Sequence, residues 1–259
     1  MSIGLTVLGS GSRGNALLVH GASGVLLVDA GFSGRELQRR MKEVSVAPED
    51  VRAILVSHEH TDHVRGLQTL ARRWDVPVFC SRLTGDAIRG RGIDAGRFHL
   101  FSAGHRFAVE GFEIEPFSIP HDAIDPVGFS IRSNGRKVAI ATDLGHASRM
   151  VQHHLACSDI LVLESNHDIA MVRDCGRPWS VKQRILSRHG HLSNEASAAV
   201  LRAVLHSATR HVVLGHASRE CNCYDLVERS ARDCLSTLGR ADVNLQVARQ
   251  DVWSETIWC

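Results

Sequence analysis

Short apolar runs separated by glycine-containing turns fill the first third of the chain, and this pattern predicts β-strands. The runs "IGLTVLG", "ALLVH" and "GVLLVDAG" follow one another in this way. The next run, "VRAILVS" at residues 51–57, is apolar on both faces, which is typical of a strand in the centre of a sheet. Later runs predict further strands at residues 76–80, 98–101, 112–119, 126–133, 137–142, 159–165, 210–215 and 243–249.

Apolar residues three or four positions apart predict helices between and after these strands. Val64, Leu67, Ala71 and Trp74 show this spacing directly after residues 57–63. Residues 57–63 should therefore form the loop between a strand and a helix. Other helices are predicted at residues 33–44, 177–189, 194–207 and 223–239.

The order of these elements indicates two similar halves, each with strands first and helices after them. Ser33 is placed to cap the first helix, and Ser193 or Asn194 is placed to cap a helix in the second half. This order favours two sheets packed together with helices outside them. The chain has no repeat, low-complexity tract or linker, so we expect one domain over residues 1–259.

Composition narrows the class of protein without naming a function. Hydrophobic residues make up 44% and charged residues 22% of the 259 residues, as in ordinary soluble proteins. The net charge of +2 is too small to indicate a polyanionic partner, whereas 16 histidines are unusually many. The seven cysteines are odd in number and form no C-x-x-C, which favours reduced thiols. With no secretory signal and no long apolar run, we expect a cytoplasmic protein that does not span a membrane.

A glycine motif near the start of the chain resembles a nucleotide-binding fingerprint. "GSGSRGN" contains G-x-G-x-x-G at Gly9, Gly11 and Gly14, directly after a predicted strand. The residues that follow predict two more strands and no helix. Because a pyrophosphate is held by a helix N-terminus in that fingerprint, we expect no NAD binding here. A tight turn that leaves room near a functional site is the better interpretation.

The most informative segment is "SHEHTDH", which places four polar, metal-capable side chains, three histidines and one aspartate, at the end of a buried strand. Burying such groups is costly unless each finds a partner. His58 and His60 lie two positions apart in an extended loop, so both can bind one metal ion. Asp62 and His63 lie at the turn into the helix and suit a second ion.

Two ions need more ligands than one loop supplies. Isolated histidine or aspartate residues follow three other predicted strands: His121 after residues 112–119, Asp143 after 137–142, and His216 after 210–215. These three residues are therefore candidates for the remaining ligands.

Taken together, "SHEHTDH", the later histidine, "ATDLG" and "LGHAS" resemble the metallo-β-lactamase superfamily of metallohydrolases. The resemblance extends from "LVDAG" at Asp29 to His216 and so covers nearly the whole chain. It implies a four-layer αββα sandwich with the functional site at one edge, between the two sheets. It also implies that Asp29 steadies the metal-binding loop.

The same resemblance implies how two divalent ions, Zn²⁺ or Mn²⁺, are held. One ion would be bound by His58, His60 and His121. The second would be bound by Asp62, His63 and His216, with Asp143 bridging the two ions.

Other motifs resemble the phosphodiesterase and nuclease branch of this superfamily. "IPHDAIDPVGFSI" stands where thiolester hydrolases carry "GHTPG", and "RHGHLSNEAS" places His191 where RNase Z-like enzymes have a histidine. "GSGSRGN", "LESNHD" and "LGHASRECN" are similar to the YycJ/WalJ-type group of DNA exonucleases. The cysteines of "ECNC", Cys221 and Cys223, depart from the expected pattern and are interpreted as structural. Asp143 and His216 are expected to be separated mainly by two helices, which excludes the large inserted β-CASP domain of RNase J-type nucleases.

The resemblance implies a binuclear phosphodiester hydrolase that acts on DNA as an exonuclease, with a metal-bridging hydroxide as nucleophile. Asp62 would orient the hydroxide, and His191 would protonate the leaving oxygen or neutralise phosphoryl charge. Two alternatives stay open: a phosphodiesterase for cyclic or other small nucleotides, and a non-catalytic metal-binding partner protein. Residues 166–168 of "ESNHD" either line the cleft or form a capping turn. The basic residues are scattered, so the nuclease expectation does not depend on charge.

Overall fold

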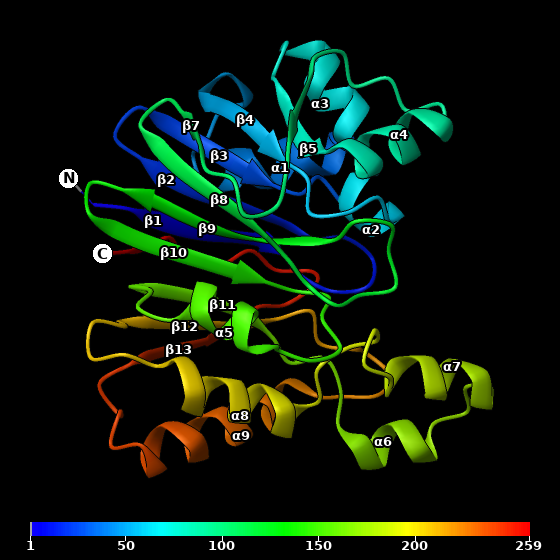
Figure 1. The fold of residues 1–259 in the computed structure, drawn as a ribbon, viewed down its shortest axis with the longest axis vertical. Coiled ribbons are helices and arrows are strands. Elements are labelled where there is room, and N and C mark those ends of the chain that lie inside the picture. Colours follow the sequence, from blue (N-terminus) through cyan, green and yellow to red (C-terminus); the bar gives the residue numbers. More distant parts are fainter. Residues whose placement is uncertain (1) are drawn as a thin grey trace.

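The computed structural model describes residues 2–259, which fold into two mixed seven-stranded sheets with helices outside them (Figure 1). In the first sheet, the strand order is β14-β1-β2-β3-β4-β5-β6; in the second, it is β13-β12-β11-β10-β9-β8-β7. The first sheet contains β1 (Gly4–Gly9), β2 (Ala16–Gly21), β3 (Gly24–Val28), β4 (Val51–Leu55), β5 (Val78–Ser81), β6 (Phe98–Phe101) and β14 (Ile257–Trp258). The second contains β7 (Phe107–Val109), β8 (Phe112–Ser118), β9 (Val127–Ser133), β10 (Arg136–Ala141), β11 (Ile160–Glu164), β12 (His211–Gly215) and β13 (Asn244–Val247).

The helices divide between the two sheets in the order of the chain (Figure 1). Ser33 caps the helix Gly34–Glu43, as predicted. Ser193 caps the helix Asn194–Val204, for which the sequence allowed either Ser193 or Asn194 as the cap. The first half contributes α1 (Gly34–Glu43), α2 (Thr61–Val64), α3 (Leu67–Arg73), α4 (Arg82–Gly90) and a 3₁₀ turn at Pro48–Asp50. The second half contributes α5 (Arg149–Leu155), α6 (Ile169–Asp174), α7 (Trp179–Ile185), α8 (Asn194–Val204) and α9 (Tyr224–Thr237).

Successive side chains of each strand point to opposite faces of its sheet, and this creates three separate apolar layers. In β3, Leu26 and Val28 face the second sheet, while Val25 and Leu27 face the helices. In β11, Val162 packs between the sheets and its neighbours pack against helices of the second half. The strands are therefore apolar on both faces, as their sequences predict. The four-layer αββα sandwich expected from the sequence is confirmed.

Several short elements were not predicted. The hydrophobic pattern did not predict α4, α5, α6, β7 or β14. It indicated two main helices between Asp143 and His216, where the structure has α5, α6, α7 and α8. The expectation of two helices was wrong. The segment nevertheless adds no further sheet to β11 and β12, so the absence of a β-CASP insertion stands for the described residues.

The glycine loop joins two strands. Gly9 ends β1 and β2 begins at Ala16, so a strand follows the loop, as expected. Asn15 in this loop donates its backbone N–H to the carbonyl of Asp62 at 2.8 Å. A side chain at Gly31 would meet that carbonyl oxygen at 1.7 Å, so only glycine allows the loops to approach so closely.

Three strand ends bring polar side chains to one place by an unusual backbone turn. Asp29, Asp143 and His216 follow β3, β10 and β12 and have φ values of 61°, 60° and 57°. Non-glycine residues seldom adopt this left-handed conformation, and residues that do are concentrated at functional sites. Because β10, β11 and β12 are parallel, their carboxyl ends lie at the same edge of the second sheet.

The buried His20 predicts a pH-dependent stability. Burial lowers the pKa of His20 from 6.5 to about 4, while its Nε2 lies 2.7 Å from the Thr6 hydroxyl. Below pH 6.5 the unfolded chain therefore binds more protons at this site than the folded chain, and stability falls until the pH reaches about 4. We expect the free energy of unfolding to fall by about 2 kcal/mol more between pH 7 and 5 in the native protein than in His20→Gln.

Urea titrations at the two pH values measure this difference. His105→Gln, at an exposed histidine, is the matched control and should behave like the native protein. Equal pH dependence in His20→Gln and the native protein would contradict the assignment.

Candidate metal centre

The first group of candidate ligands comes from the loop after β4 and the loop after β8. His58, His60 and His121 each offer a ring nitrogen, and these atoms lie within 4.8 Å of one another. Gly190 O lies 3.2 Å from His121 Nδ1, so the main chain at Gly190 orients the ring. His58 is buried and its Nε2 has no hydrogen-bond partner among the described residues.

The second group lies beside the first. Ligand atoms of Asp62, His63 and His216 also lie within 4.8 Å of one another. His63 Nδ1 donates to Asp29 Oδ2 at 2.7 Å, which leaves His63 Nε2 to face the group. Asp29 also accepts from the backbone N–H and the hydroxyl of Ser57, so it fixes the start of the "SHEHTDH" loop. This geometry matches the steadying role expected for Asp29.

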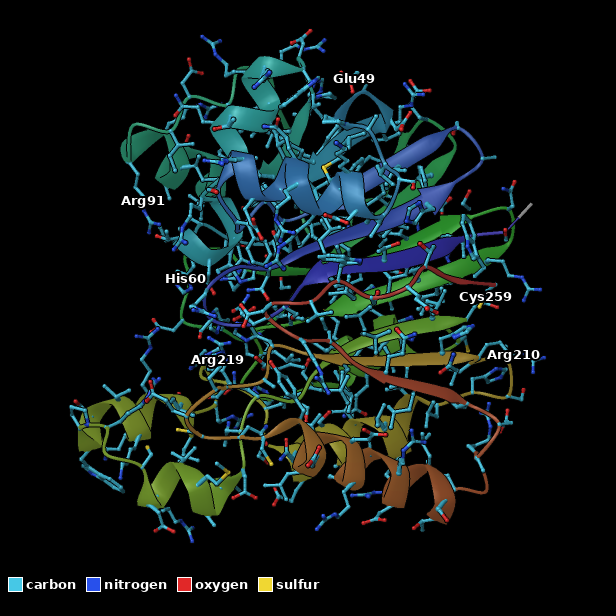
Figure 2. The ribbon with its side chains drawn as sticks, turned by 180° about the vertical axis from the view of Figure 1, so that it is seen from behind. Glu49, His60, Arg91, Arg210, Arg219 and Cys259 are labelled. Atoms are coloured by element: carbon cyan, nitrogen blue, oxygen red, sulfur yellow. The ribbon has the colours of Figure 1, made fainter. Side chains whose placement is uncertain are left out.

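Asp143 lies between the two groups. Its Oδ2 is 3.2 Å from His63 Nε2, and its Oδ1 is 3.3 Å from His216 Nδ1 and 3.9 Å from His121 Nε2. The carboxylate is buried, and Oδ2 has no hydrogen-bond partner among residues 2–259. The structure thus brings all seven candidate ligands together in the expected grouping. Figure 2 shows His60 near one edge of the molecule.

Glu164 is a member of this site that the sequence analysis missed. It ends β11, is fully buried, and its Oε1 accepts hydrogen bonds of 2.8 Å from both His191 Nδ1 and His216 Nδ1. Its Oε2 accepts from the backbone N–H groups of Leu144 and Leu192. The available signal was a charged residue at the end of the otherwise apolar strand "ILVLE".

Glu164 fixes the orientation of two imidazole rings. Because both Nδ1–H groups point at its carboxylate, the Nε2 atoms of His191 and His216 are left to face other partners. His216 Nε2 is buried and has no hydrogen-bond partner within the described part of the chain. The side chain of His191 is 19% exposed, so it sits at the mouth of the site.

The unpartnered buried atoms show that the residues fit metal ions. His58 Nε2, Asp143 Oδ2 and His216 Nε2 are all buried without a hydrogen bond among residues 2–259. Such atoms are normally hydrogen-bonded in folded proteins. Imidazole nitrogen and carboxylate oxygen are the donors that divalent zinc and manganese accept. The missing partners and the donor types both fit divalent cations.

Charge in the cluster is balanced by protons when no cation is bound. Burial opposes protonation of His216, but the carboxylates of Asp143, Asp62 and Glu164 raise its pKa to about 10. Burial likewise opposes protonation of His63, but Asp29 and Asp143 raise its pKa well above 6.5. Burial and the neighbouring His63 hold the pKa of His58 well below 6.5. The carboxylates therefore create a demand for positive charge that divalent cations can meet.

The glycine loop contributes a polar side chain to the site. Asn15 Nδ2 lies 3.1 Å from His63 Nε2 and 3.4 Å from Asp62 Oδ2. The Asn15 carboxamide oxygen accepts from the backbone N–H of Gly11 at 2.8 Å, which fixes its orientation. The motif that resembled a nucleotide fingerprint therefore supports this cluster.

The residues left open by the sequence have structural contacts. Asp168 caps α6 by accepting from the backbone N–H of Met171, so the capping interpretation holds for this residue. Asn166 donates its side-chain amide to the carbonyl of His216 at 2.7 Å. Cys221 is buried in a small apolar cluster with Val172 and Ile185, whereas Cys223 is exposed.

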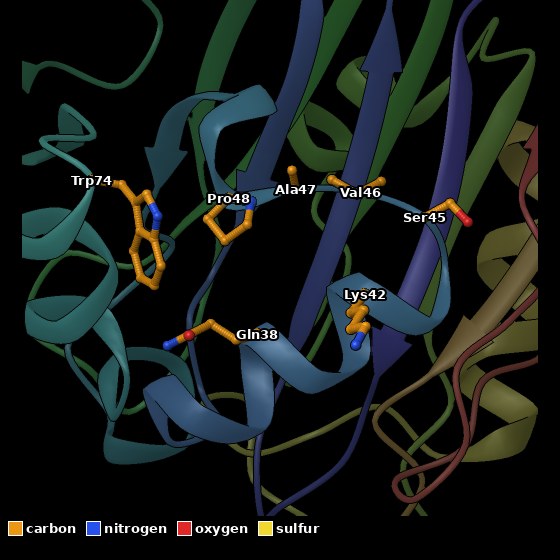
Figure 3. Close-up of a pocket in the computed structure, with 7 residues that line it drawn as sticks. All are labelled: Gln38, Lys42, Ser45, Val46, Ala47, Pro48 and Trp74. Carbon is orange, nitrogen blue, oxygen red and sulfur yellow. The ribbon is translucent and has the colours of Figure 1, made fainter.

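A separate hollow of about 440 Å³ lies on the helix-covered side of the first sheet (Figure 3). It is bordered by α1, by residues 45–48 and by Trp74. Its lining includes none of the candidate ligands, and Lys42 is its one charged side chain. The chemistry of the candidate centre therefore does not involve this pocket.

Comparisons with known proteins agree with the fold and the cluster. Residues 25–217 match the model of the Beta-lactamase superfamily domain. The chain is 37% identical over 241 residues to Exodeoxyribonuclease YycJ of Bacillus anthracis, covering 92% of this chain and 91% of that protein. It is 32% identical over 246 residues to Exodeoxyribonuclease WalJ of Streptococcus pneumoniae, covering 93% and 90%.

The fold has counterparts among solved structures. The metallo-beta-lactamase fold protein YhfI from Bacillus subtilis superposes with a TM-score of 0.75 and 14% identity, over the full length of both chains. This chain belongs to the β-lactamase superfamily and has the metallo-β-lactamase fold. It is thus a metal-dependent hydrolase whose fold implies divalent-metal binding, and the structure contains a cluster of histidine and aspartate residues that could hold metal ions.

Among residues 2–259, none of the helices has both the length and the apolar character needed to cross a lipid bilayer.

Proposed function

We propose that this protein is a DNA exonuclease that hydrolyses phosphodiester bonds with two divalent metal ions. The relatives named exodeoxyribonuclease support this function, because they align along more than nine-tenths of the chain. The observation that carries the proposal is the complete cluster of seven candidate ligands with Glu164 and His191 beside it. We further propose that residues 1–259 act as one domain in the cytoplasm, where the seven free thiols of the structure are stable.

We assign the ligands by their grouping. His58, His60 and His121 would hold one Zn²⁺ or Mn²⁺ ion. Asp62, His63 and His216 would hold the second, with the Asp143 carboxylate shared between them. When bound, the two ions lower the pKa of a water molecule and polarise the phosphate oxygens.

The other site residues handle protons and orientation. The side chain of Asp62 is 23% exposed, and it would orient the attacking water and accept its proton. His191 is fixed through Nδ1 by Glu164, so its Nε2 is the atom that would protonate the leaving oxygen. Glu164 holds the His191 ring in the orientation from which Nε2 would donate.

A substrate screen tests the proposed function. Linear DNA, RNA, cyclic nucleotides and bis(p-nitrophenyl) phosphate would be incubated with the protein, with and without Mn²⁺. We expect metal-dependent cleavage of linear DNA. Cleavage of cyclic nucleotides alone would favour a small-molecule phosphodiesterase, and no cleavage by metal-loaded protein would favour a binding partner.

His191→Ala should retain both metal ions and slow DNA cleavage by roughly 10²–10⁴-fold, the usual scale for a positioned proton donor. The loss should be smaller for a nitrophenyl ester, because its leaving group needs little protonation. Steady-state rates and metal analysis check both expectations. His189→Ala, at an exposed histidine two residues away, is the matched control.

Loss of metal from His191→Ala would show that His191 is a ligand. An equal loss of rate on both substrates would show that it stabilises phosphoryl charge and is no acid. Full activity would make it an ordinary loop residue.

A further inference from the structure

Arginine side chains from three separate segments border the metal cluster. They come from the end of α4, the loop after α7, and the loop after β12. Arg91 contacts Glu59, which lies between His58 and His60 in the sequence. Arg188 contacts His146, three residues after Asp143, and Arg219, three residues after His216, contacts Asp251. Cations beside the cluster could contact parts of a substrate other than the phosphate that is cleaved.

Arg91 lies on the first side. It follows α4, is exposed, and donates from its guanidinium to the carbonyl of Glu59, the residue between His58 and His60. No carboxylate among the described residues forms an ion pair with it. The Glu59 carboxylate is buried and accepts from the backbone N–H of Ile124. The charge of Arg91 is thus held beside the cluster and available to an anion.

Arg188 lies on the second side, three residues before His191. Its guanidinium is 3.2 Å from His146 Nε2, and its carbonyl is 3.2 Å from His146 Nδ1. A side chain at Gly145 would meet the Arg188 carbonyl carbon and oxygen at 2.3 Å, so glycine allows the two loops to touch. These contacts hold the Arg188 backbone against Gly145, two residues after Asp143, and within residues 2–259 Arg188 has no carboxylate partner.

Arg219 lies on the third side, three residues after His216. It shares the carboxylate of Asp251 with Arg13, which comes from the glycine loop. Two exposed cations thus face one exposed anion, and a net positive charge is left at this rim.

Many basic residues elsewhere are neutralised. Arg39 pairs with Glu36 and Glu43, Arg40 pairs with Glu36, and Arg136 pairs with Asp159. At the rim itself, the one acidic residue adjacent to His121 in the sequence, Asp122, is paired with Arg184 at 2.8 Å. Asp122 therefore does not neutralise the three rim arginines, Arg91, Arg188 and Arg219.

Figure 2 shows how Arg91 and Arg219 lie relative to His60. Arg91, His60 and Arg219 follow one another along the same edge of the molecule, with His60 between the two arginines. A single phosphodiester bound at the metal cluster presents one phosphate to these cations. A nucleic-acid strand presents further phosphates on both sides of the one being cleaved.

We propose that Arg91, Arg188 and Arg219 bind the phosphates that flank the scissile phosphate, so that the substrate is a polynucleotide strand and not an isolated diester. This inference rests on the proposed nuclease function. These three arginines would then favour a polynucleotide over a small phosphodiester, which offers no flanking phosphates.

The test compares Arg91→Gln, Arg188→Gln and Arg219→Gln with Arg210→Gln in the metal-loaded enzyme. Arg210 is exposed and lies at the edge opposite His60, so it is the matched control (Figure 2). The ratio of kcat/KM on linear DNA to kcat/KM on bis(p-nitrophenyl) phosphate should fall about tenfold for each rim variant, the scale of one charge-assisted hydrogen bond. Arg210→Gln should keep the native ratio.

The salt dependence gives a second readout. Binding of a phosphorothioate strand, followed by fluorescence anisotropy, should lose about one unit of log–log salt slope in each rim variant. Replacement by lysine should retain the slope because it retains the charge. Circular dichroism and metal analysis check that each variant is folded and loaded.

Native ratios and slopes in all three rim variants, in an enzyme that degrades linear DNA, would overturn this inference and leave the proposed function intact. Equal losses of ratio and slope in Arg210→Gln would also overturn it, because the effect would then come from the net charge of the protein and not from the position of the arginine. An enzyme that cleaves bis(p-nitrophenyl) phosphate but no DNA would instead overturn the proposed function, and this inference with it.

Discussion

Asp143→Asn is expected to lose metal and to reduce DNA cleavage roughly 10³-fold or more, because the shared charge of Asp143 is removed while its shape is kept. The carboxylate lies between both ligand groups, 3.2 Å from His63 Nε2 and 3.3 Å from His216 Nδ1. Asparagine tolerates the left-handed backbone at this position, where φ is 60°. The substitution therefore tests the charge without straining the chain.

Metal analysis and cleavage rates check this prediction. The native protein should hold about two ions per chain, and the variant should hold fewer. Asp233→Asn, on the exposed face of α9, controls for the general effect of losing a carboxylate. Native metal content and activity in Asp143→Asn would show that the two ligand groups do not share this residue.

Glu164→Gln should slow DNA cleavage by roughly 10²–10⁴-fold and weaken metal binding by about 10–100-fold. Each oxygen of Glu164 accepts two hydrogen bonds: one from His191 and His216, the other from the backbone of Leu144 and Leu192. Glutamine has only one such oxygen. Whichever way it is oriented, its amide N–H₂ faces a pair of donors and leaves buried groups unsatisfied.

Three measurements separate this positioning role from a general loss of stability. Metal affinity by titration should fall, the melting temperature should fall, and the rate loss should be smaller for a nitrophenyl ester, as for His191→Ala. Glu255→Gln, at an exposed position, should change none of them. A lower melting temperature with unchanged metal affinity and unchanged leaving-group dependence would make Glu164 a purely structural residue.

The candidate ligands could be found from the sequence because each follows a strongly apolar strand. "SHEHTDH" stands out by its density of polar groups, and Asp143 and His216 stand out as single polar residues after "KVAIAT" and "RHVVLG". The same apolar runs predicted the sheets, because a strand that is buried on both faces has an unbroken apolar sequence. The sequence was sufficient to predict a candidate ligand wherever that residue directly follows a predicted strand.

Glu164 was missed because its role depends on contacts with residues that are distant in the sequence. It is the last residue of an apolar strand, and its partners His191 and His216 are 27 and 52 positions away. Nothing within "ILVLE" distinguishes a carboxylate that orients two imidazoles from one that ends a strand in solvent.

The short helices were missed for a different reason. The segment of α4, "RLTGDAIRG", contains two glycines, which are poor helix formers. In α5 only Val151 and Leu155 are buried, so the periodic pattern is confined to a single pair of residues. Such helices depend on packing against the sheets more than on local sequence.

The most direct test of the central claim compares linear single-stranded DNA with a covalently closed circle of the same sequence, using the purified protein loaded with Mn²⁺. A divalent-metal-dependent exonuclease should shorten the linear strand progressively, leave the circle intact, and stop when EDTA is added. Cleavage of the circle would contradict exonuclease action, and cleavage that continues in EDTA, or no cleavage of either DNA, would contradict the account as a whole.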